Sequence, residues 1–250
     1  MSQGDYTVRV HAAARDLPDG WDALVDAGTP FLESAWLGIL EDSGCVRERT
    51  GWLPQHLTVW RGSRLVGGAP LYVKAHSMGE FVFDQSWASA AMRAGIAYYP
   101  KLLVGVPVTG ARLLALPDER ANVVAVIATA LEDLCRREGF SSVHVNFCLP
   151  DEAAALGARG WLRRTAYQYQ WQNGGFGSFD DYLGSLRSKR RNQVRRERRA
   201  LAEQGIEIVV HRGAEIPAAL PPRLFALYRS TIERLTWGQE YLNAGFFPVA

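Results

Sequence analysis

The segment from residue 120 to residue 139 constrains the fold most. Its sequence, RANVVAVIATALEDLCRREG, repeats apolar residues at the spacing of one helix face, and Gly139 stands where a helix C-terminal cap belongs. That face comprises Val123, Val126, Ile127, Ala130, Leu131 and Leu134. Residues 142–147, SVHVNF, follow with the alternating pattern of a strand. We therefore expect a packed helix that leads into a strand.

Helix-like and strand-like segments alternate along the whole chain, which predicts an α/β protein. We expect further helices over residues 20–27, 31–41, 86–94, 151–159, 179–204 and 221–235. Strands are expected over residues 56–61, 64–73, 101–106, 111–116, 164–171 and 206–211. Pro70 suits a strand edge or the end of a pairing, because proline has no N–H to donate. Glycines at 174, 175 and 177 favour a domain boundary near residues 160–175.

Composition excludes several classes of protein. Hydrophobic residues make up 48% and charged residues 22%, as in ordinary globular proteins. Three scattered cysteines show no disulfide framework and no metal-ligand spacing, so no metal site is expected. The N-terminal residues lack a signal-peptide pattern, and no apolar run approaches the roughly 20 residues that span a bilayer. A cytoplasmic protein without a transmembrane segment is the expectation.

One strongly basic segment stands out. Residues 187–199 contain eight basic side chains and one acidic side chain, a local charge of +7, whereas the whole chain carries +2. A solvated helix normally mixes its charge signs. Guanidinium groups bind phosphate in bidentate fashion, so the segment predicts a phosphate-bearing partner. A plain solvated face stays open as the alternative.

The stretch KAHSMGEFVFDQSWA, residues 74–88, places His76, Glu80 and Asp84 within nine residues. Spacings of four would align them on one helix face, as acid–base chemistry requires. Gly79 and the FVF string instead favour a loop that opens into a strand. In the structural alternative, His76 and Glu80 only orient the backbone of a turn.

Three other groups of residues are candidate ligand contacts. Tyr98, Tyr99 and Lys101 surround Pro100, and such aromatic–proline pairs more often shape a groove wall. His144 lies on an alternating strand, where a structural histidine is the commoner case. Trp171 and Asn173 lie beside flexible glycines, as at a ligand-facing strand end.

Several strings of the chain together resemble a known family. They are PLYVKAHSMGEFVFDQSWA, GIAYYPKLL, VTGARLL, SSVHVNF, YQWQNGGFGSFDDYLGSLRSKRRNQVRRERR and YRSTIERLTWGQEYLNAGFF. On these strings the chain resembles the Fem-like, peptidoglycan-biosynthesis-type N-acyltransferases of bacteria. HS-GEFVFD together with YYPKL is the most specific part of the match.

The resemblance implies tandem GNAT-like domains with mixed sheets. Residues 1–165 would form the first domain, and residues 166–250 would begin a second that includes the basic helix. Because the family continues beyond the Tyr241-Leu242 region, we expect that second domain to be incomplete here.

The resemblance also implies transfer of an acyl or aminoacyl group to an amine. Aminoacyl-tRNA or acyl-CoA would be the co-substrate, with no tightly bound cofactor, and the acceptor would be a small-molecule or cell-wall precursor amine. The candidate proton acceptors are His76, Glu80 and Asp84. The candidate substrate-binding residues are Tyr98, Tyr99, Lys101, His144, Trp171 and Asn173. The candidate donor-phosphate ligands are Lys189, Arg190, Arg191 and Arg195. A non-catalytic module that binds RNA or a phosphate ligand stays open as the alternative.

Overall fold

The computed structural model describes residues 5–26, 29–236 and 238–248. The chain divides into two compact units. The first consists of Met1–Arg164 and Pro221–Ala250, and the second of Thr165–Leu220. Each unit is described by itself below.

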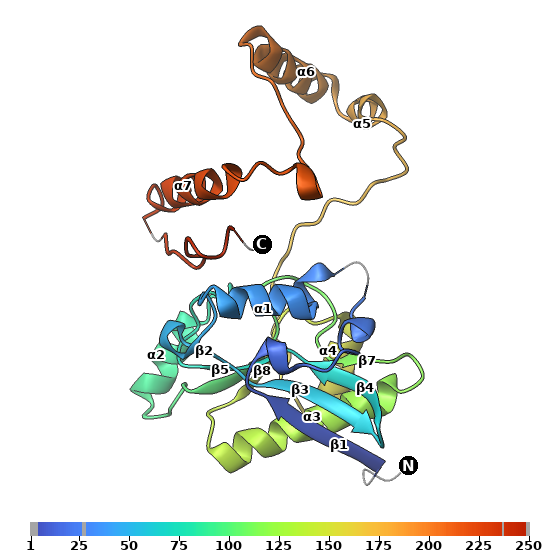
Figure 1. Cartoon of the computed structure of the whole chain (residues 1–250), viewed down its shortest axis with the longest axis vertical. Coiled ribbons are helices and arrows are strands. Elements are labelled where there is room, and N and C mark those ends of the chain that lie inside the picture. The colour runs from blue at the N-terminus through green and yellow to red at the C-terminus, as the bar shows by residue number, and fades with distance from the viewer. Residues whose placement is uncertain (1–4, 27–28, 237, 249–250) are drawn as a thin grey trace. The chain divides into compact units, whose positions relative to one another are not determined.

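The first unit is built on two four-stranded sheets (Figure 1), with strand orders β1-β3-β4-β7 and β2-β5-β6-β8. The first sheet is antiparallel, whereas the second is mixed because β6 pairs with β8 in parallel. The strands are β1 (Tyr6–His11), β2 (Trp52–Pro54), β3 (His56–Arg61), β4 (Arg64–Ala69), β5 (Leu71–Lys74), β6 (Lys101–Val104), β7 (Leu114–Ala115) and β8 (Val143–Val145). The predicted α/β class with mixed sheets is confirmed.

Seven α-helices are described. They are α1 (Ser34–Asp42), α2 (Gln85–Arg93), α3 (Arg120–Glu138), α4 (Pro150–Ala158), α5 (Phe179–Ser185), α6 (Ser188–Glu203) and α7 (Leu220–Ile232). Of these, α5 and α6 belong to the second unit. Among the described residues, no helix is long and apolar enough to cross a membrane.

Helix α3 supplies the helical side of the main core, as its periodicity predicts. Val123, Ile127 and Leu131 are fully buried and join Val59, Leu102 and other strand residues in one hydrophobic cluster. Burying each such side chain stabilises the fold by about 1.5–3 kcal/mol. Gly139 ends the helix with a φ of 69°, a left-handed conformation that glycine adopts without steric cost.

Pro70 separates two strands that the sequence predicts as one, over residues 64–73. Strand β4 ends at Ala69 in the first sheet, and β5 begins at Leu71 in the second. Proline cannot donate a ladder hydrogen bond, but the Pro70 carbonyl accepts one from the Gly105 N–H at 3.1 Å. The chain thereby passes from one sheet to the other.

Four expected elements differ from the structure. The described part of the expected helix 20–27, residues 20–26, contains only a 3-10 turn, Asp22–Leu24, and β1 forms where no strand was expected. Residues 164–171 and 206–211 are not strands, since no described strand pairs with either segment. The expected helix 179–204 is interrupted where Leu186 and Arg187 adopt extended ψ angles of 150° and 144°.

Close packing of α3 on β4 depends on Gly67. A Cβ atom at this position would clash with Val123 Cγ1 and would lie 2.7 Å from the Leu114 carbonyl oxygen. We expect Gly67→Ala to lower the free energy of unfolding by about 1–3 kcal/mol, because the helix must move away from the sheet. Urea unfolding measures this change.

The matched control is Gly38→Ala on α1, where an added Cβ would meet nothing within 4 Å. Alanine favours a helix interior by up to about 1 kcal/mol over glycine, so this variant should be as stable as the parent or more stable. Equal stability of the two variants would contradict the assigned role of Gly67.

Candidate active site

A buried ammonium group organises the most polar part of the first unit. Lys101, on β6, is fully buried, and its Nζ donates to Ser77 Oγ at 2.8 Å, Glu80 Oε2 at 3.0 Å and Asp84 Oδ2 at 2.8 Å. Both carboxylate side chains are also fully buried. A buried charge is tolerated only when it is paired and hydrogen-bonded, and Lys101 meets both conditions. We refer to Ser77, Glu80, Asp84 and Lys101 as the charge cluster.

The loop of residues 75–84 brings the two carboxylates to Lys101. It runs from the end of β5 to the start of α2, so the strand expected after this loop is absent. The Asp84 carbonyl accepts hydrogen bonds from Trp87 and Ala88 and thereby starts α2 instead. Phe81 and Phe83 adopt positive φ angles of 57° and 50°. Such strained residues persist where the surroundings over-determine them, and they concentrate at functional sites.

Asp84 is held in its ionised form. The Tyr98 hydroxyl donates to Asp84 Oδ2 at 2.8 Å, beside the Lys101 ammonium. Burial by itself would raise the pKa of Asp84, but hydrogen bonds from Lys101, Ser77 and Tyr98 outweigh it and lower the pKa to about 2. Asp84 is therefore an anion throughout the physiological range.

Glu80 has the opposite tendency. Its Oε2 accepts from Lys101 and, at 3.4 Å, from Asn146 Nδ2. Burial is the largest influence and raises the pKa of Glu80, although the Lys101 charge acts against it. Two neighbouring carboxylates whose pKa values are displaced in opposite directions are typical of acid–base sites.

In each of the two carboxylates, one oxygen accepts no hydrogen bond within the described part of the chain. Glu80 Oε1 and Asp84 Oδ1 are buried and have no hydrogen-bond partner among the described residues. Unsatisfied buried acceptors are rare in native proteins, and each one requires an explanation. Here they are two acceptors that a ligand N–H could satisfy.

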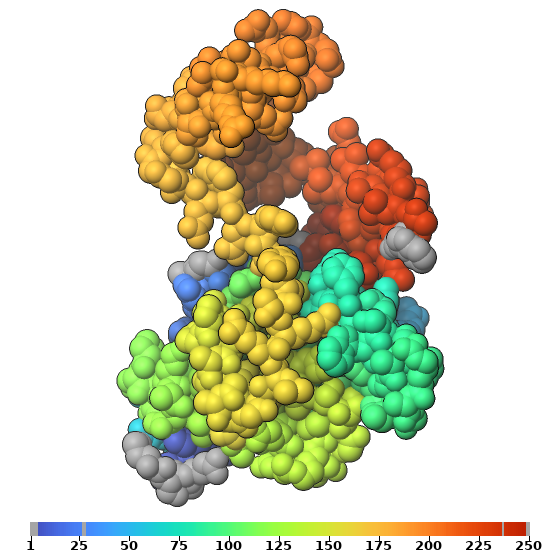
Figure 2. Space-filling model, turned by 180° about the vertical axis from the view of Figure 1, so that it is seen from behind, coloured from blue at the N-terminus to red at the C-terminus, as the bar shows by residue number. Residues whose placement is uncertain are grey.

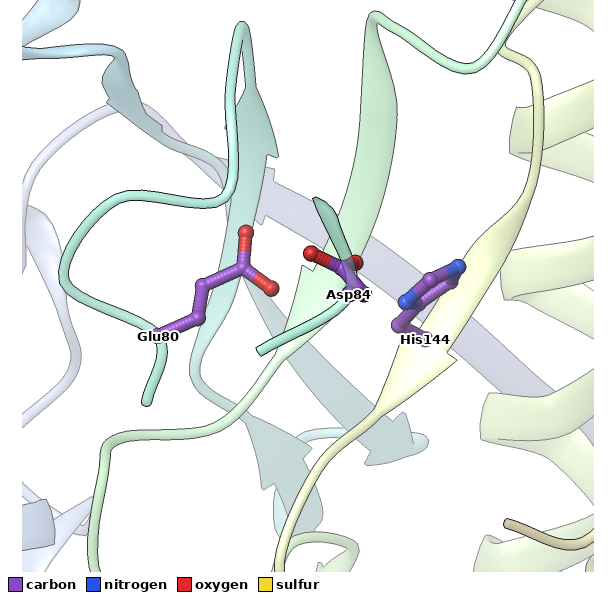
Figure 3. Close-up of side chains that lie close together, drawn as sticks. All are labelled: Glu80, Asp84 and His144. Atoms are coloured by element: carbon purple, nitrogen blue, oxygen red, sulfur yellow. The ribbon is translucent and has the colours of Figure 1, made fainter. Parts of the chain in front are cut away.

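His144 completes the group shown in Figure 3. One ligand atom each from Glu80, Asp84 and His144 lie within 4.8 Å of one another. Burial, followed by the Lys101 charge, lowers the pKa of His144 to about 4, so its imidazole is neutral at neutral pH.

The three groups in Figure 3 have the chemistry of metal ligands. The Lys101 ammonium, however, already lies within 3.0 Å of both carboxylates. At an effective dielectric constant of 20, each unit of added positive charge 4 Å from it would cost about 4 kcal/mol. A neutral amine therefore fits these acceptors better than a divalent cation.

Lys74 lies opposite Lys101 in the β5–β6 register. Its Nζ donates to the Met78 carbonyl at 3.2 Å and lies 3.4 Å from the centroid of the Trp52 ring. Burial, with the Lys101 charge, lowers the pKa of Lys74 to about 7, although Glu80 opposes this shift. The cluster thus borders a second buried amine that loses its proton readily.

The structure brings together most of the residues expected from the sequence. In the first unit, hydrogen bonds or ligand-atom separations within 4.8 Å connect five of them: Glu80, Asp84, Tyr98, Lys101 and His144. The Tyr99 hydroxyl forms a hydrogen bond with Ser77 Oγ at 2.8 Å. His76 instead packs over Gly51, and its Nδ1 accepts from the Met78 N–H. That geometry matches the turn-orienting alternative.

Sequence reasoning missed Ser77, Lys74 and Asn146. Asn146 follows His144 by two residues and so falls on the same face of an extended segment, a signal that the alternating pattern of SVHVNF contains. Ser77 lies inside the HSMGE string itself. Lys74 could be recognised only from its register with Lys101.

The second unit carries the basic helix. No residue of α6 is buried. The atoms of this part of the chain are orange in Figure 2. Lys189, Arg190 and Arg195 are exposed. Arg191 has a different role, since its Nη1 donates to the carbonyls of Gly184 and Leu186 and so secures the turn between α5 and α6.

The comparisons with known proteins identify the family. A model of the FemAB-like family, described as peptidoglycan biosynthesis/recognition, matches residues 15–250. The chain belongs to this family. The resemblance inferred from the sequence is thus confirmed, and no curated protein matches the sequence.

Solved structures give more distant similarities. A crystal structure of an aminoglycoside acetyltransferase from an uncultured soil metagenomic sample, in complex with sisomicin, matches with a TM-score of 0.40 and 16% identity. The match covers 68% of this chain and 98% of that one. The complex of the same acetyltransferase with trehalose matches with a TM-score of 0.36 and 14% identity, over 68% and 99% of the two chains.

Ionisation of Asp84 should make stability depend on acid pH. Because its pKa is lower in the folded chain, the ionised carboxylate stabilises the fold above about pH 4, and this contribution is lost as pH falls towards 2. We expect the stability difference between parent and Asp84→Asn to shrink by about 1 kcal/mol from pH 5 to pH 3, and by about 2 kcal/mol at pH 2. Urea unfolding at each pH tests this.

Asp118→Asn is the control, since Asp118 is exposed and pairs with the exposed Arg64. Its stability difference from the parent should stay nearly constant over the same range. A constant difference for Asp84→Asn as well would mean that Asp84 titrates normally in the folded chain.

Proposed function

We propose that this FemAB-like protein is an N-acyltransferase whose charge cluster receives the acceptor amine. The observation that carries this proposal is the pair of buried, unpartnered carboxylate oxygens, Glu80 Oε1 and Asp84 Oδ1. An amine offers the N–H donors that they lack. The family's description, peptidoglycan biosynthesis/recognition, supports an amine of a peptidoglycan precursor as the acceptor.

The two carboxylates would have different roles in the reaction. Asp84 stays ionised and orients the amine through a hydrogen bond, whereas Glu80, whose pKa is raised, accepts the proton that the amine must lose. The Glu80 side chain is fully buried, so an amine reaches it only when the loop of residues 75–84 opens.

The acyl group would then pass from the donor to the amine in one addition and one elimination. The amine nitrogen attacks the acyl carbonyl carbon, a C–N bond forms, and Glu80 takes the amine proton. The bond from the carbonyl carbon to its leaving group breaks, and that group, a thiolate or a ribose alkoxide, takes the proton back from Glu80. Holding the two reactants together supplies much of the rate enhancement in such transfers.

Glu80→Gln tests the proton acceptor. The amide keeps the shape of the side chain but cannot accept the proton, so we expect turnover to fall about 10²–10⁴-fold while donor affinity is unchanged. Product formation is followed by mass spectrometry of the acylated acceptor, and donor binding by calorimetry. Glu48→Gln, at an exposed glutamate, should leave both values unaltered.

Unchanged turnover in Glu80→Gln would remove Glu80 from the mechanism. A parallel loss of donor affinity would instead point to a general disturbance of the fold, which circular dichroism of the variant would reveal.

The exposed cations of α6 favour an anionic donor, either aminoacyl-tRNA or acyl-CoA. Lys189, Arg190 and Arg195 are exposed on a helix that has no buried residue. If each neutralises one phosphate of tRNA, replacing all three with alanine should reduce the salt-dependence slope of log K by about 2–3. Filter binding of labelled tRNA across a salt series, with acyl-CoA as competitor, measures this slope.

The control variant replaces Arg136 and Arg137, two exposed arginines at the end of α3, with alanine. It should keep the parent slope if the site is local to α6. An equal effect of both variants would mean that tRNA binds by general charge attraction.

A second candidate function rests on α6 alone. A non-catalytic module that binds RNA or a phosphate ligand would show the same salt dependence and no acylated product. Detection of a covalently acylated amine excludes it.

A further inference from the structure

The second unit contains an aromatic depression that the charge cluster and the basic helix do not explain. It has a volume of about 540 Å³ and is lined by Trp171, Asn173, Phe176, Gly177, Ser178, Phe179 and Tyr182. This volume lies within the range of about 300–1,000 Å³ that is usual for small-ligand sites. Trp171 is 65% exposed, so a large aromatic face is open to a ligand.

The depression is built from rings that support one another. Tyr182, on α5, is surrounded by the rings of Trp171, Phe176 and Phe179, with centroid distances of 5.9, 5.6 and 5.7 Å. Edge and tilted contacts of this kind leave ring faces available for stacking.

Asn173 fixes the turn that carries Trp171 and Phe176. Its Oδ1 accepts from the Phe176 N–H at 2.8 Å, and its Nδ2 donates to the Phe176 carbonyl at 3.2 Å. The side chain is therefore engaged with the backbone of its own loop. Asn173 acts here as a positioning residue that keeps the aromatic wall in place.

Cations border the depression on the side of α6. The Arg198 guanidinium lies 4.5 Å from the centroid of the Phe179 ring, and Arg195 is 3.7 Å from the Asp180 carboxylate. Asp180 stands in the first turn of α5, so a phosphate bound by Arg198 would replace the Asp180 carboxylate as the partner of Arg195. Aromatic faces next to guanidinium groups are the combination that binds a base and its phosphate.

From this arrangement we propose that the aromatic depression binds the adenine of an adenosine phosphate, and that Arg195 and Arg198 hold its phosphate. The inference rests on the proposed function, because both donor classes carry this chemistry: coenzyme A contains a phosphorylated adenosine, and aminoacyl-tRNA ends in an adenosine. Adenine would stack on Trp171, whereas the acyl group would extend out of the depression.

Calorimetric titration of the full chain with adenosine 3′,5′-bisphosphate tests the site. Stacking on an aromatic side chain contributes about 1–3 kcal/mol per base, so Trp171→Ala should weaken binding about 5- to 150-fold. Trp171→Phe, which keeps an aromatic face, should restore most of the affinity. Trp87→Ala is the matched control, since Trp87 is 61% exposed on α2 in the first unit, and it should bind like the parent.

Inorganic phosphate and adenosine serve as separate probes. If adenosine 3′,5′-bisphosphate binds no more tightly than phosphate, or if Trp171→Ala binds it like the parent, the proposed base site is wrong. Competition by coenzyme A alone would assign the site to an acyl-CoA donor, and competition by tRNA alone to an aminoacyl-tRNA donor. Either result supports an adenosine site.

Failure of this site and failure of the proposed function give different results. Acylated product that forms at the parent rate in Trp171→Ala, with no nucleotide binding to the parent, would overturn the adenosine site and leave the transferase proposal intact. Trp171-dependent nucleotide binding without any acylated product supports the adenosine site and counts against the transferase.

Discussion

The position of one ammonium group determines how the candidate active site is assembled. Lys101 cannot be buried on β6 without counter-charges, because an isolated ammonium in a protein interior is strongly disfavoured. The loop of residues 75–84 must therefore fold back and present Glu80 and Asp84 to it, even though Phe81 and Phe83 adopt left-handed backbone conformations to do so. These strained conformations persist because the surrounding contacts, the charge pairing among them, over-determine the loop.

The same interaction gives the two carboxylates different chemistry. Asp84 accepts from both Lys101 and Tyr98 and stays ionised, whereas burial is the largest influence on Glu80 and raises its pKa. In the proposed mechanism, this difference makes Asp84 the residue that orients the amine and Glu80 the proton acceptor. The oxygens that Lys101 leaves without a partner define where an acceptor amine would fit.

The second unit contains aromatic and basic side chains in place of buried carboxylates. There, an aromatic wall within residues 171–182 lies beside Arg198 of α6, and we have proposed that it binds a nucleotide. The first unit thus offers acceptors for an amine, and the second offers a surface for a phosphorylated donor. In the proposed function, the acceptor amine and the donor would therefore bind to different units of the chain.

The sequence by itself determined the elements whose signals are local. The periodicity of α3, its glycine cap and the FemAB-like strings could all be identified from neighbouring residues, and so could Glu80 and Asp84 as candidate acids. The strands predicted from the local pattern at residues 164–171 and 206–211 do not form, because a strand needs a partner strand that the local pattern cannot supply. Only the tertiary structure showed that Lys101 is the buried counter-ion, that Ser77 and Asn146 join the cluster, and that His76 turns away towards Gly51. These facts depend on the β5–β6–β8 register and on burial, which bring together residues up to 66 positions apart along the chain.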